Sequence, residues 1–274
     1  MTLPAGYLLD LDGTLYSGGA AVPGAPETLA RLRQAGVPFR FVTNTTSRPR
    51  AGLAERLRGY GFEAGEEEIF TPVTAAAELL RGRGVRVVAP FLPPAALDDL
   101  DGFTLAGGLA RRAAESSATR PEAVVVGDLA ERWTYGLMQE AFEYLLRGAI
   151  FVALSRDRYW LRDGALALDA GPFVAGLEYA ASRTALVAGK PSAAFFDEAV
   201  ASLGLDAAAR HDVVMVGDDL WSDVRGAQEA GYRGWIVRTG KFREDVLRES
   251  GIAPDRVIAS VAALGDALPA RSMG

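Results

Sequence analysis

Short apolar runs that end in polar side chains recur along the chain. Residues 7–11, 38–42 and 212–216 are such runs, and aspartate, threonine or asparagine stands at or just after the end of each. Apolar runs this short are typical of buried strands, whose side chains alternate between the two faces of a sheet. The pattern therefore predicts several buried strands with polar groups at their tips.

Apolar residues between these runs recur at helical spacing. Leu29 and Leu32 lie on one face of a helix that Gly36 ends, and Leu53 and Leu57 lie on a second helix. A strand, a helix and a strand in this order predict a right-handed crossover between parallel strands. Such sheets bind ligands at the carboxyl ends of their strands. We therefore expect an α/β fold with a Rossmann-like, doubly wound parallel sheet.

A second α/β unit is expected inside the first. Residues 85–91, 123–126 and 149–154 are further strand-like runs, and the stretches at 109–114 and 137–146 are helical in pattern. After them the main sheet is expected to resume at residues 184–188. We therefore predict a core domain of residues 1–77 and 184–274, with residues 78–183 inserted into it.

The composition of the chain argues against several classes of function. The chain has 274 residues, of which 49% are hydrophobic, and its formal net charge is -6 with the basic residues dispersed, so no nucleic-acid partner is expected. It has no cysteine and one histidine, His211, which excludes thiolate and multi-histidine metal sites. No apolar run approaches the roughly 20 residues that cross a bilayer, and no signal segment opens the chain. We expect a cytoplasmic protein without a membrane partner.

The first strand carries two acids at its tip. Asp10 and Asp12 point to the same side if the extended conformation continues, because side chains alternate along a strand. Two carboxylates about 5 Å apart repel by roughly 3 kcal/mol at an effective dielectric constant near 20. A cation between them removes this cost, so the pair predicts a magnesium-type site with oxygen ligands.

Three other polar positions stand at strand or loop ends, and each has a structural alternative. Thr43 and Asn44 could close a turn, and Asp218 or Asp219 could cap the next helix. Lys190 is more distinctive, because only it and one other of the 29 basic residues are lysine. A lysine in an arginine-rich chain suggests a compact positive charge for an oxyanion.

Together these positions supply the parts of an aspartate-based phosphoryl transfer. Asp10 would attack phosphorus and form an aspartyl phosphate, and Asp12 would protonate the leaving group. Mg²⁺ would be held by Asp10, the main-chain carbonyl of Asp12, and Asp218. The remaining phosphate oxygens would be bound by Thr43, Asn44 and Lys190, and the metal site would be supported by Asp219 and Asp223.

These motifs resemble those of the haloacid dehalogenase superfamily. Residues 10–14, 43–44, 189–191 and 217–223 are similar to its four ordered motifs, and the insertion resembles the α/β cap of its NagD-like and nitrophenyl phosphatase subgroup. Residues 41–46, residues 171–174 with 177–180, and residues 237–241 are most similar to the branch that contains phospholysine phosphohistidine inorganic pyrophosphate phosphatase. The resemblance covers nearly the whole chain.

The resemblance implies a capped phosphatase that depends on magnesium, and a homodimer that forms through the cap. It also implies that the cap selects the substrate. The candidates for contact with the substrate are Arg156, Asp157, Arg158 and Tyr159, and the alternative is that they form a solvated turn.

Our leading hypothesis is a phosphatase whose substrate is a small phosphorylated metabolite: a phosphate ester, a phosphoramidate or pyrophosphate. One alternative is a non-catalytic phosphate-sensing or receiver-like module, and another is a phosphomutase. Asp12 and the inserted cap argue against the sensing module, because a stable phosphorylated signal gains nothing from an acid beside the leaving group.

Overall fold

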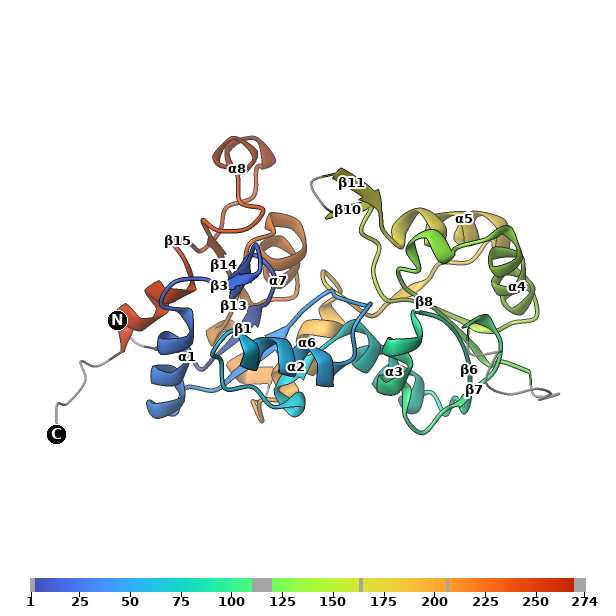
Figure 1. Ribbon diagram of the computed structural model, residues 1–274, viewed down its shortest axis with the longest axis horizontal. Helices are drawn as coiled ribbons and strands as arrows, with labels where there is room; N and C mark the ends of the chain where they lie inside the picture. Colours follow the sequence, from blue (N-terminus) through green and yellow to red (C-terminus); the bar gives the residue numbers. More distant parts are fainter. Residues whose placement is uncertain (1–2, 110–119, 163–164, 206, 269–274) are drawn as a thin grey trace. The chain divides into compact units, whose positions relative to one another are not determined.

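The computed structural model describes residues 3–109, 120–162, 165–205 and 207–268. The chain forms two compact units (Figure 1). The first comprises Met1–Thr43, Arg50–Phe70 and Lys190–Gly274, and the second comprises Asn44–Pro49 and Thr71–Gly189. Both are built on a parallel sheet, so the predicted α/β class is confirmed.

The main sheet of the first unit has six parallel strands in the order β15-β14-β13-β1-β4-β5. Strand β1 lies between β13 and β4, with Asp10 in register with Val42. The three polar strand ends therefore meet at one edge. The strands are β1 (Gly6–Asp10), β4 (Phe39–Val42), β5 (Ile69–Phe70), β13 (Val213–Gly217), β14 (Arg233–Val237) and β15 (Arg256–Ile258).

Helices cover both faces of this sheet, as a doubly wound fold requires. On one face Trp235 of β14 belongs to a core that includes Leu29 of α1 and Leu53 of α2, whereas the next residue, Ile236, packs with Leu220 on the other face. The α-helices in the described part of this unit are α1 (Ala25–Gln34), α2 (Arg50–Gly59), α6 (Ala193–Ala201), α7 (Gly226–Glu229) and α8 (Glu244–Ser250).

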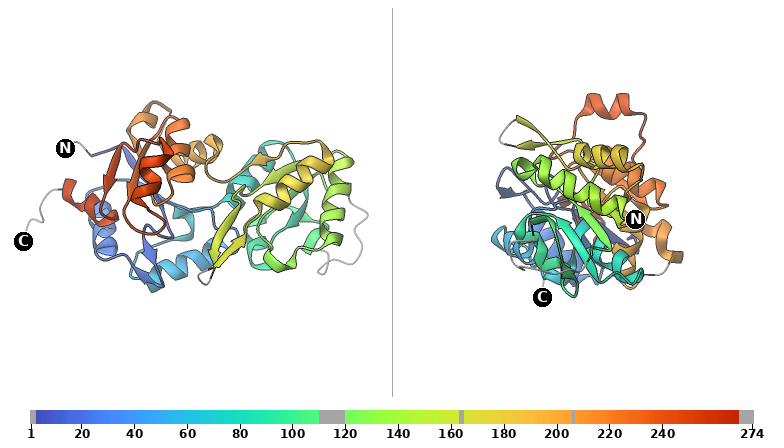
Figure 2. Two further views of the ribbon diagram at one scale, coloured as in Figure 1. Left: turned by 90° about the horizontal axis from the view of Figure 1, so that it is seen from above. Right: turned by 90° about the vertical axis from the view of Figure 1, so that its right-hand side faces the viewer.

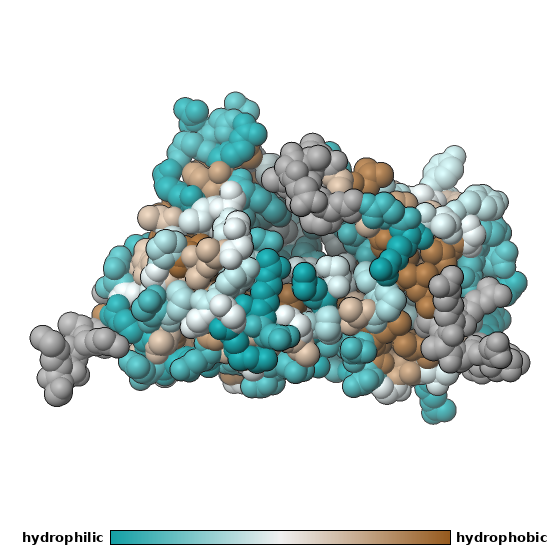
Figure 3. All heavy atoms as spheres, viewed as in Figure 1, coloured by the Kyte–Doolittle hydropathy of each residue, from teal (hydrophilic) through white to brown (hydrophobic). Residues whose placement is uncertain are grey.

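Shorter elements complete the first unit. A hairpin of β2 (Tyr16–Ser17) and β3 (Ala20–Ala21) follows the tip of β1, and the π-helical turn η6 (Leu220–Arg225) follows β13. Helix α8 has no buried residue and presents a hydrophilic surface (Figure 3). The 3-10 helices are η1 (Glu66–Glu68), η5 (Ala207–Asp212) and η7 (Val261–Ala267).

The second unit contains a five-stranded parallel sheet in the order β12-β9-β8-β6-β7. Helices α4 and α5 pack against each other and share a core with β8 and β9 (Figure 2). The strands are β6 (Val87–Phe91), β7 (Thr104–Leu105), β8 (Ala123–Val126), β9 (Ile150–Ala153) and β12 (Leu186–Val187). The helices are α3 (Pro72–Gly82), η2 (Pro94–Leu100), η4 (Ala130–Arg132), α4 (Tyr135–Leu146) and α5 (Gly171–Ala181).

Two local expectations for the second unit need correction. The run at residues 184–188 does not resume the main sheet, because β12 pairs with β9. An antiparallel hairpin of β10 (Tyr159–Arg162) and β11 (Ala165–Leu168) lies in a segment for which the sequence predicted no strand. The strand with which β12 pairs depends on residues far away in the sequence, so the local pattern at residues 184–188 did not indicate that partner. The helix expected at 109–114 lies, beyond residue 109, outside the described residues.

Several expectations stay predictions. They include the domain boundaries at residues 78 and 183, the homodimer, the cytoplasmic location and the absence of nucleic-acid or membrane partners. Within the described residues, no helix is long and apolar enough to cross a membrane.

Candidate active site

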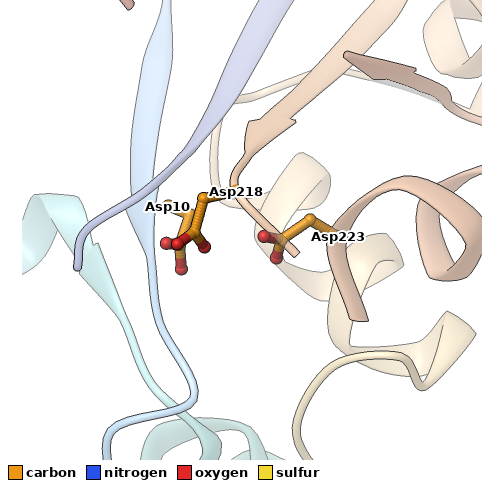
Figure 4. Close-up of side chains that lie close together, drawn as sticks. All are labelled: Asp10, Asp218 and Asp223. Atoms are coloured by element: carbon orange, nitrogen blue, oxygen red, sulfur yellow. The ribbon is translucent and has the colours of Figure 1, made fainter. Parts of the chain in front are cut away.

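Three carboxylates converge at the carboxyl edge of the main sheet. Asp10 is the last residue of β1, Asp218 follows β13, and Asp223 projects from η6. Their carboxylates each offer an oxygen within 4.8 Å of the others, and their exposures are 7%, 3% and 1%. Figure 4 shows the carboxylates of Asp10 and Asp218 next to one another, with that of Asp223 beside them. The sequence predicted that these three residues belong to one site, and the fold brings them together.

A buried ammonium group joins two of these acids. The Nζ atom of Lys190 lies 2.6 Å from Asp10 Oδ1 and 2.6 Å from Asp223 Oδ1, and the lysine is 2% exposed. Burial opposes its charge, but the two carboxylates raise the pKa of Lys190 above its usual range. One ammonium group cannot neutralise all three carboxylates when they are ionised, so a bound cation favours their ionised forms.

Asp219 lies next to the cluster, whereas Asp223 belongs to it. Asp219 Oδ1 accepts hydrogen bonds from the main-chain N–H groups of Trp221 (2.9 Å) and Ser222 (3.1 Å), so Asp219 caps η6. Asp223 Oδ2 accepts the N–H of Asp219 at 3.1 Å. Gly217 permits this arrangement, since a Cβ there would lie 2.1 Å from Asp223 Oδ2. The capping alternative therefore describes Asp219, and the carboxylate of Asp218 enters the cluster.

Asp12 lies beside the cluster on the exposed surface of the loop after β1. Partial desolvation, and then the charge of Asp10, raise the pKa of Asp12 above its ordinary value. Arg56 and Lys241 oppose this shift. A carboxyl group that keeps its proton to a higher pH is suited to donate that proton to a leaving group.

Thr43 and Asn44 are adjacent in sequence but fall in different units. Thr43 follows β4 in the first unit and is 2% exposed. Asn44 belongs to the second unit, where its Nδ2 atom donates to Asp157 Oδ2 at 3.3 Å. The phosphate-binding role of both residues stays a prediction.

The four candidates for substrate selection all lie in the second unit. Arg156 forms an ion pair with Glu178 at 2.7 Å. The Arg158 guanidinium lies 5.7 Å from the centre of the Tyr159 ring, and Tyr159 is 51% exposed. Asp157 accepts the hydrogen bond from Asn44. Their contact with a substrate stays a prediction.

Sequence reasoning missed some neighbours of the carboxylates. The hydroxyl of Thr14 lies 3.4 Å from Asp10 Oδ2, and the main-chain N–H of Lys241 donates to Asp218 Oδ2 at 2.7 Å. Lys241 also places its Nζ atom 3.3 Å from Asp219 Oδ2. The rarity of lysine in the chain singled out Lys241 along with Lys190, but no local pattern connected Lys241 with β13.

The metal-free protein is expected to lose stability as the pH rises from about 4 to about 8. Burial, and then the charge of Asp10, raise the pKa of Asp218 to about 8, and burial raises that of Asp223 to about 7. In the unfolded chain both groups titrate near 3.8, so over this interval the folded state holds more protons and the free energy of unfolding falls. Each group contributes up to about 1.4 kcal/mol per pH unit.

Urea denaturation in chelator from pH 5 to 8.5 measures this dependence. Asp218→Asn removes one of the groups and should flatten the decline, and added Mg²⁺ should oppose it most at high pH. A free energy of unfolding that rises through this interval, or a decline that Asp218→Asn leaves unchanged, would contradict the expectation.

Two family models match the chain. The family described as haloacid dehalogenase-like hydrolase matches residues 7–103, and the one described as HAD-hydrolase-like matches residues 187–264. These segments carry the aspartates at the tips of β1 and β13.

The chain is also similar to curated proteins over most of its length. It is 44% identical to haloacid dehalogenase-like hydrolase domain-containing protein 2 from Homo sapiens, over 86% of this chain and 85% of that protein. It is 35% identical to phospholysine phosphohistidine inorganic pyrophosphate phosphatase from Homo sapiens, over 96% of this chain and 93% of that protein.

Solved structures with the same fold include two phosphatases. A p-nitrophenyl phosphatase from Archaeoglobus fulgidus matches with a TM-score of 0.86 and 28% identity, over 97% of this chain and all of the other. A glycerol phosphate phosphatase from Mycobacterium tuberculosis, in complex with magnesium, matches with a TM-score of 0.81 and 28% identity, over 96% of this chain and 77% of the other.

Proposed function

We propose that this protein hydrolyses a small phosphate ester, phosphoramidate or pyrophosphate through an aspartyl phosphate on Asp10. The premise is that the chain belongs to the haloacid dehalogenase-like hydrolase family and is a phosphatase. The observation that carries the proposal is the buried ion cluster in which Lys190 holds Asp10 at 2.6 Å beside Asp218. A carboxylate held next to an ammonium group is oriented for attack on a phosphoryl group, and the ammonium group attracts that group's oxygens.

The donor set fits a divalent cation of the magnesium type. Three buried carboxylates share one lysine, so their ionised forms need a further positive charge, and Mg²⁺ prefers such oxygen ligands. Asp10, Asp218 and the main-chain carbonyl of Asp12 would hold the ion, with Asp219 and Asp223 in support. When bound, Mg²⁺ supplies charge that lowers the repulsion among the carboxylates and between them and phosphate. The magnesium complex of the glycerol phosphate phosphatase supports this choice of metal.

Asp10 and Asp12 divide the chemistry between them. A carboxylate oxygen of Asp10 forms a bond to phosphorus while the bond from phosphorus to the leaving oxygen or nitrogen breaks, and Asp12 gives its proton to that leaving atom. Water then attacks the aspartyl phosphate, and Asp12 takes a proton from it. The products are inorganic phosphate and a regenerated Asp10 carboxylate, which distinguishes this reaction from that of a phosphomutase.

Lys190 and Thr43 would bind the phosphoryl oxygens. The Lys190 ammonium group stands beside the nucleophile, where negative charge spreads over these oxygens in the transition state. Thr43, at the tip of the adjacent strand, would donate its hydroxyl, with Asn44 as a further donor. The substrate would be a small phosphorylated metabolite, selected by Arg156, Asp157, Arg158 and Tyr159.

Phosphate release from a panel of small compounds tests the proposal. The panel contains nitrophenyl phosphate, glycerol phosphate, pyrophosphate and a phosphoramidate, because the names of the similar proteins indicate these phosphate classes. We expect turnover of at least one compound with Mg²⁺, a loss of at least about 100-fold in chelator, and recovery when Mg²⁺ is restored. Full activity after thorough chelation would exclude the metal role, and transfer of the phosphoryl group without free phosphate would indicate a mutase.

A further inference from the structure

The turn between β14 and α8 contacts two separate parts of the carboxylate site. This turn comprises residues 238–241. Its Lys241 main-chain N–H donates to Asp218 Oδ2 at 2.7 Å, and its Thr239 hydroxyl donates to the Gly13 carbonyl oxygen at 2.5 Å. Asp218 follows β13, whereas Gly13 lies in the loop after β1. One short turn therefore joins the loops that carry Asp218 and Asp12.

Two glycines let main-chain atoms approach the Asp218 carboxylate closely. A Cβ on Gly240 would lie 2.0 Å from Asp218 Oδ2 and 2.5 Å from the Cα atom of Gly13. A Cβ on Gly13 would also lie 2.0 Å from Asp218 Oδ2. Both residues have positive φ, +62° for Gly240 and +84° for Gly13, which glycine adopts without strain. The carboxylate is thus packed between the two loops, with no room for a side chain on either glycine.

The same turn also reaches the acid that caps η6. Lys241 is 70% exposed, and its Nζ atom lies 3.3 Å from Asp219 Oδ2. The main-chain N–H of Asp219 in turn donates to Asp223 Oδ2 at 3.1 Å. Contacts from one turn therefore extend, directly or through one residue, to Asp218 and Asp223.

We propose that the 238–241 turn is a positioning device that sets the affinity of the carboxylate site for a divalent cation. This inference rests on the proposed metal site. Asp218 can serve as a ligand only if its side chain is held in one orientation, and the Lys241 N–H and the two glycines impose that orientation. The Thr239 hydroxyl fixes the loop whose Asp12 carbonyl would be a further ligand. Loss of such an outer partner weakens metal binding by about 10–100-fold in characterised sites.

Direct binding of Mg²⁺ to purified variants, without substrate, tests the inference. Calorimetric titration should give a dissociation constant about tenfold higher for Thr239→Val and about 100-fold higher for Gly240→Ala than for the wild type. Thr239→Ser restores the hydroxyl and should bind within about twofold of the wild type. At saturating Mg²⁺, the kcat of Thr239→Val and Gly240→Ala should return toward the wild-type value. Their KM should stay close to that of the wild type, because the proposed role of the turn is to hold the metal ligands and not to bind substrate.

Two matched variants control for stability. Thr28→Val matches Thr239→Val, because it removes a hydrogen bond from the Thr28 hydroxyl to the carbonyl oxygen of Ala262 at 3.2 Å. Gly251→Ala matches Gly240→Ala, because Gly251 also has positive φ, +69°, but no atom lies within 4 Å of its Cβ position. Both should lower the melting temperature and leave the Mg²⁺ dissociation constant unchanged.

The outcomes separate this inference from the proposed function. If Thr239→Val folds and binds Mg²⁺ as tightly as the wild type, the turn is only structural and the inference fails while the magnesium site stands. If Gly240→Ala does not fold, the comparison of Thr239→Val with Thr239→Ser decides alone. A wild-type protein that binds no Mg²⁺ overturns both.

Discussion

Asp10→Asn is expected to reduce phosphate release by at least about a thousandfold, because an amide cannot act as the nucleophile that a carboxylate provides. The substitution preserves the shape of the side chain. The amide of the new side chain can still contact two polar groups. These are the Lys190 ammonium group, 2.6 Å from Asp10 Oδ1, and the Thr14 hydroxyl, 3.4 Å from Asp10 Oδ2. The loss should therefore appear in turnover and not in folding.

Initial rates on the best substrate of the panel, with a melting curve for each protein, measure this effect. Asp266→Asn makes the same chemical change at an exposed position of η7 and should keep the wild-type rate. Asp10→Asn that folds and retains more than about one tenth of the wild-type rate would rule out an aspartyl phosphate on this residue.

Lys190→Met is expected to lower the free energy of unfolding of the metal-free protein by about 3–5 kcal/mol at pH 8, because it leaves two buried carboxylates without their cation. Lys190 is 2% exposed, and its partners Asp10 and Asp223 are 7% and 1% exposed. Burial raises the pKa of Asp223 to about 7, so near pH 5.5 Asp223 can take up a proton in place of its ion pair. The loss of stability should then be smaller, whereas a simple packing defect would be independent of pH.

Urea denaturation at both pH values, in chelator, makes this comparison. Lys241→Met is the matched control, since that lysine is 70% exposed and its ion pair with Asp219 should contribute less than about 1 kcal/mol. The double variant Lys190→Met with Asp223→Asn removes one unpaired charge and should recover part of the loss. Equal costs for the two lysines would show that the buried cluster does not depend on its ammonium group.

The sequence by itself determined three strands of the main sheet and the polar residues at their tips. Buried runs at β1, β4 and β13 are local patterns, and the residues that follow them, such as Asp10, Thr43 and Asp218, are adjacent in the chain to the strands that place them. Parallel strands with right-handed crossovers bring such ends to one edge, so the carboxylate cluster followed from general rules of the fold. Lys190 was identified by composition, because lysine is rare in this chain.

Only the tertiary structure decided which acid plays which part. Asp218 and Asp219 are neighbours with the same side chain, but their contacts differ. Asp219 accepts hydrogen bonds from the N–H groups at the start of η6, whereas Asp218 accepts one from the Lys241 N–H and is enclosed by Gly13 and Gly240. The Thr239 hydrogen bond to Gly13 spans 226 positions in sequence, and β12 joins β9 through pairing that its own residues do not specify. Such contacts depend on where distant segments lie after folding, and a local pattern of hydrophobic and polar residues carries no information about that.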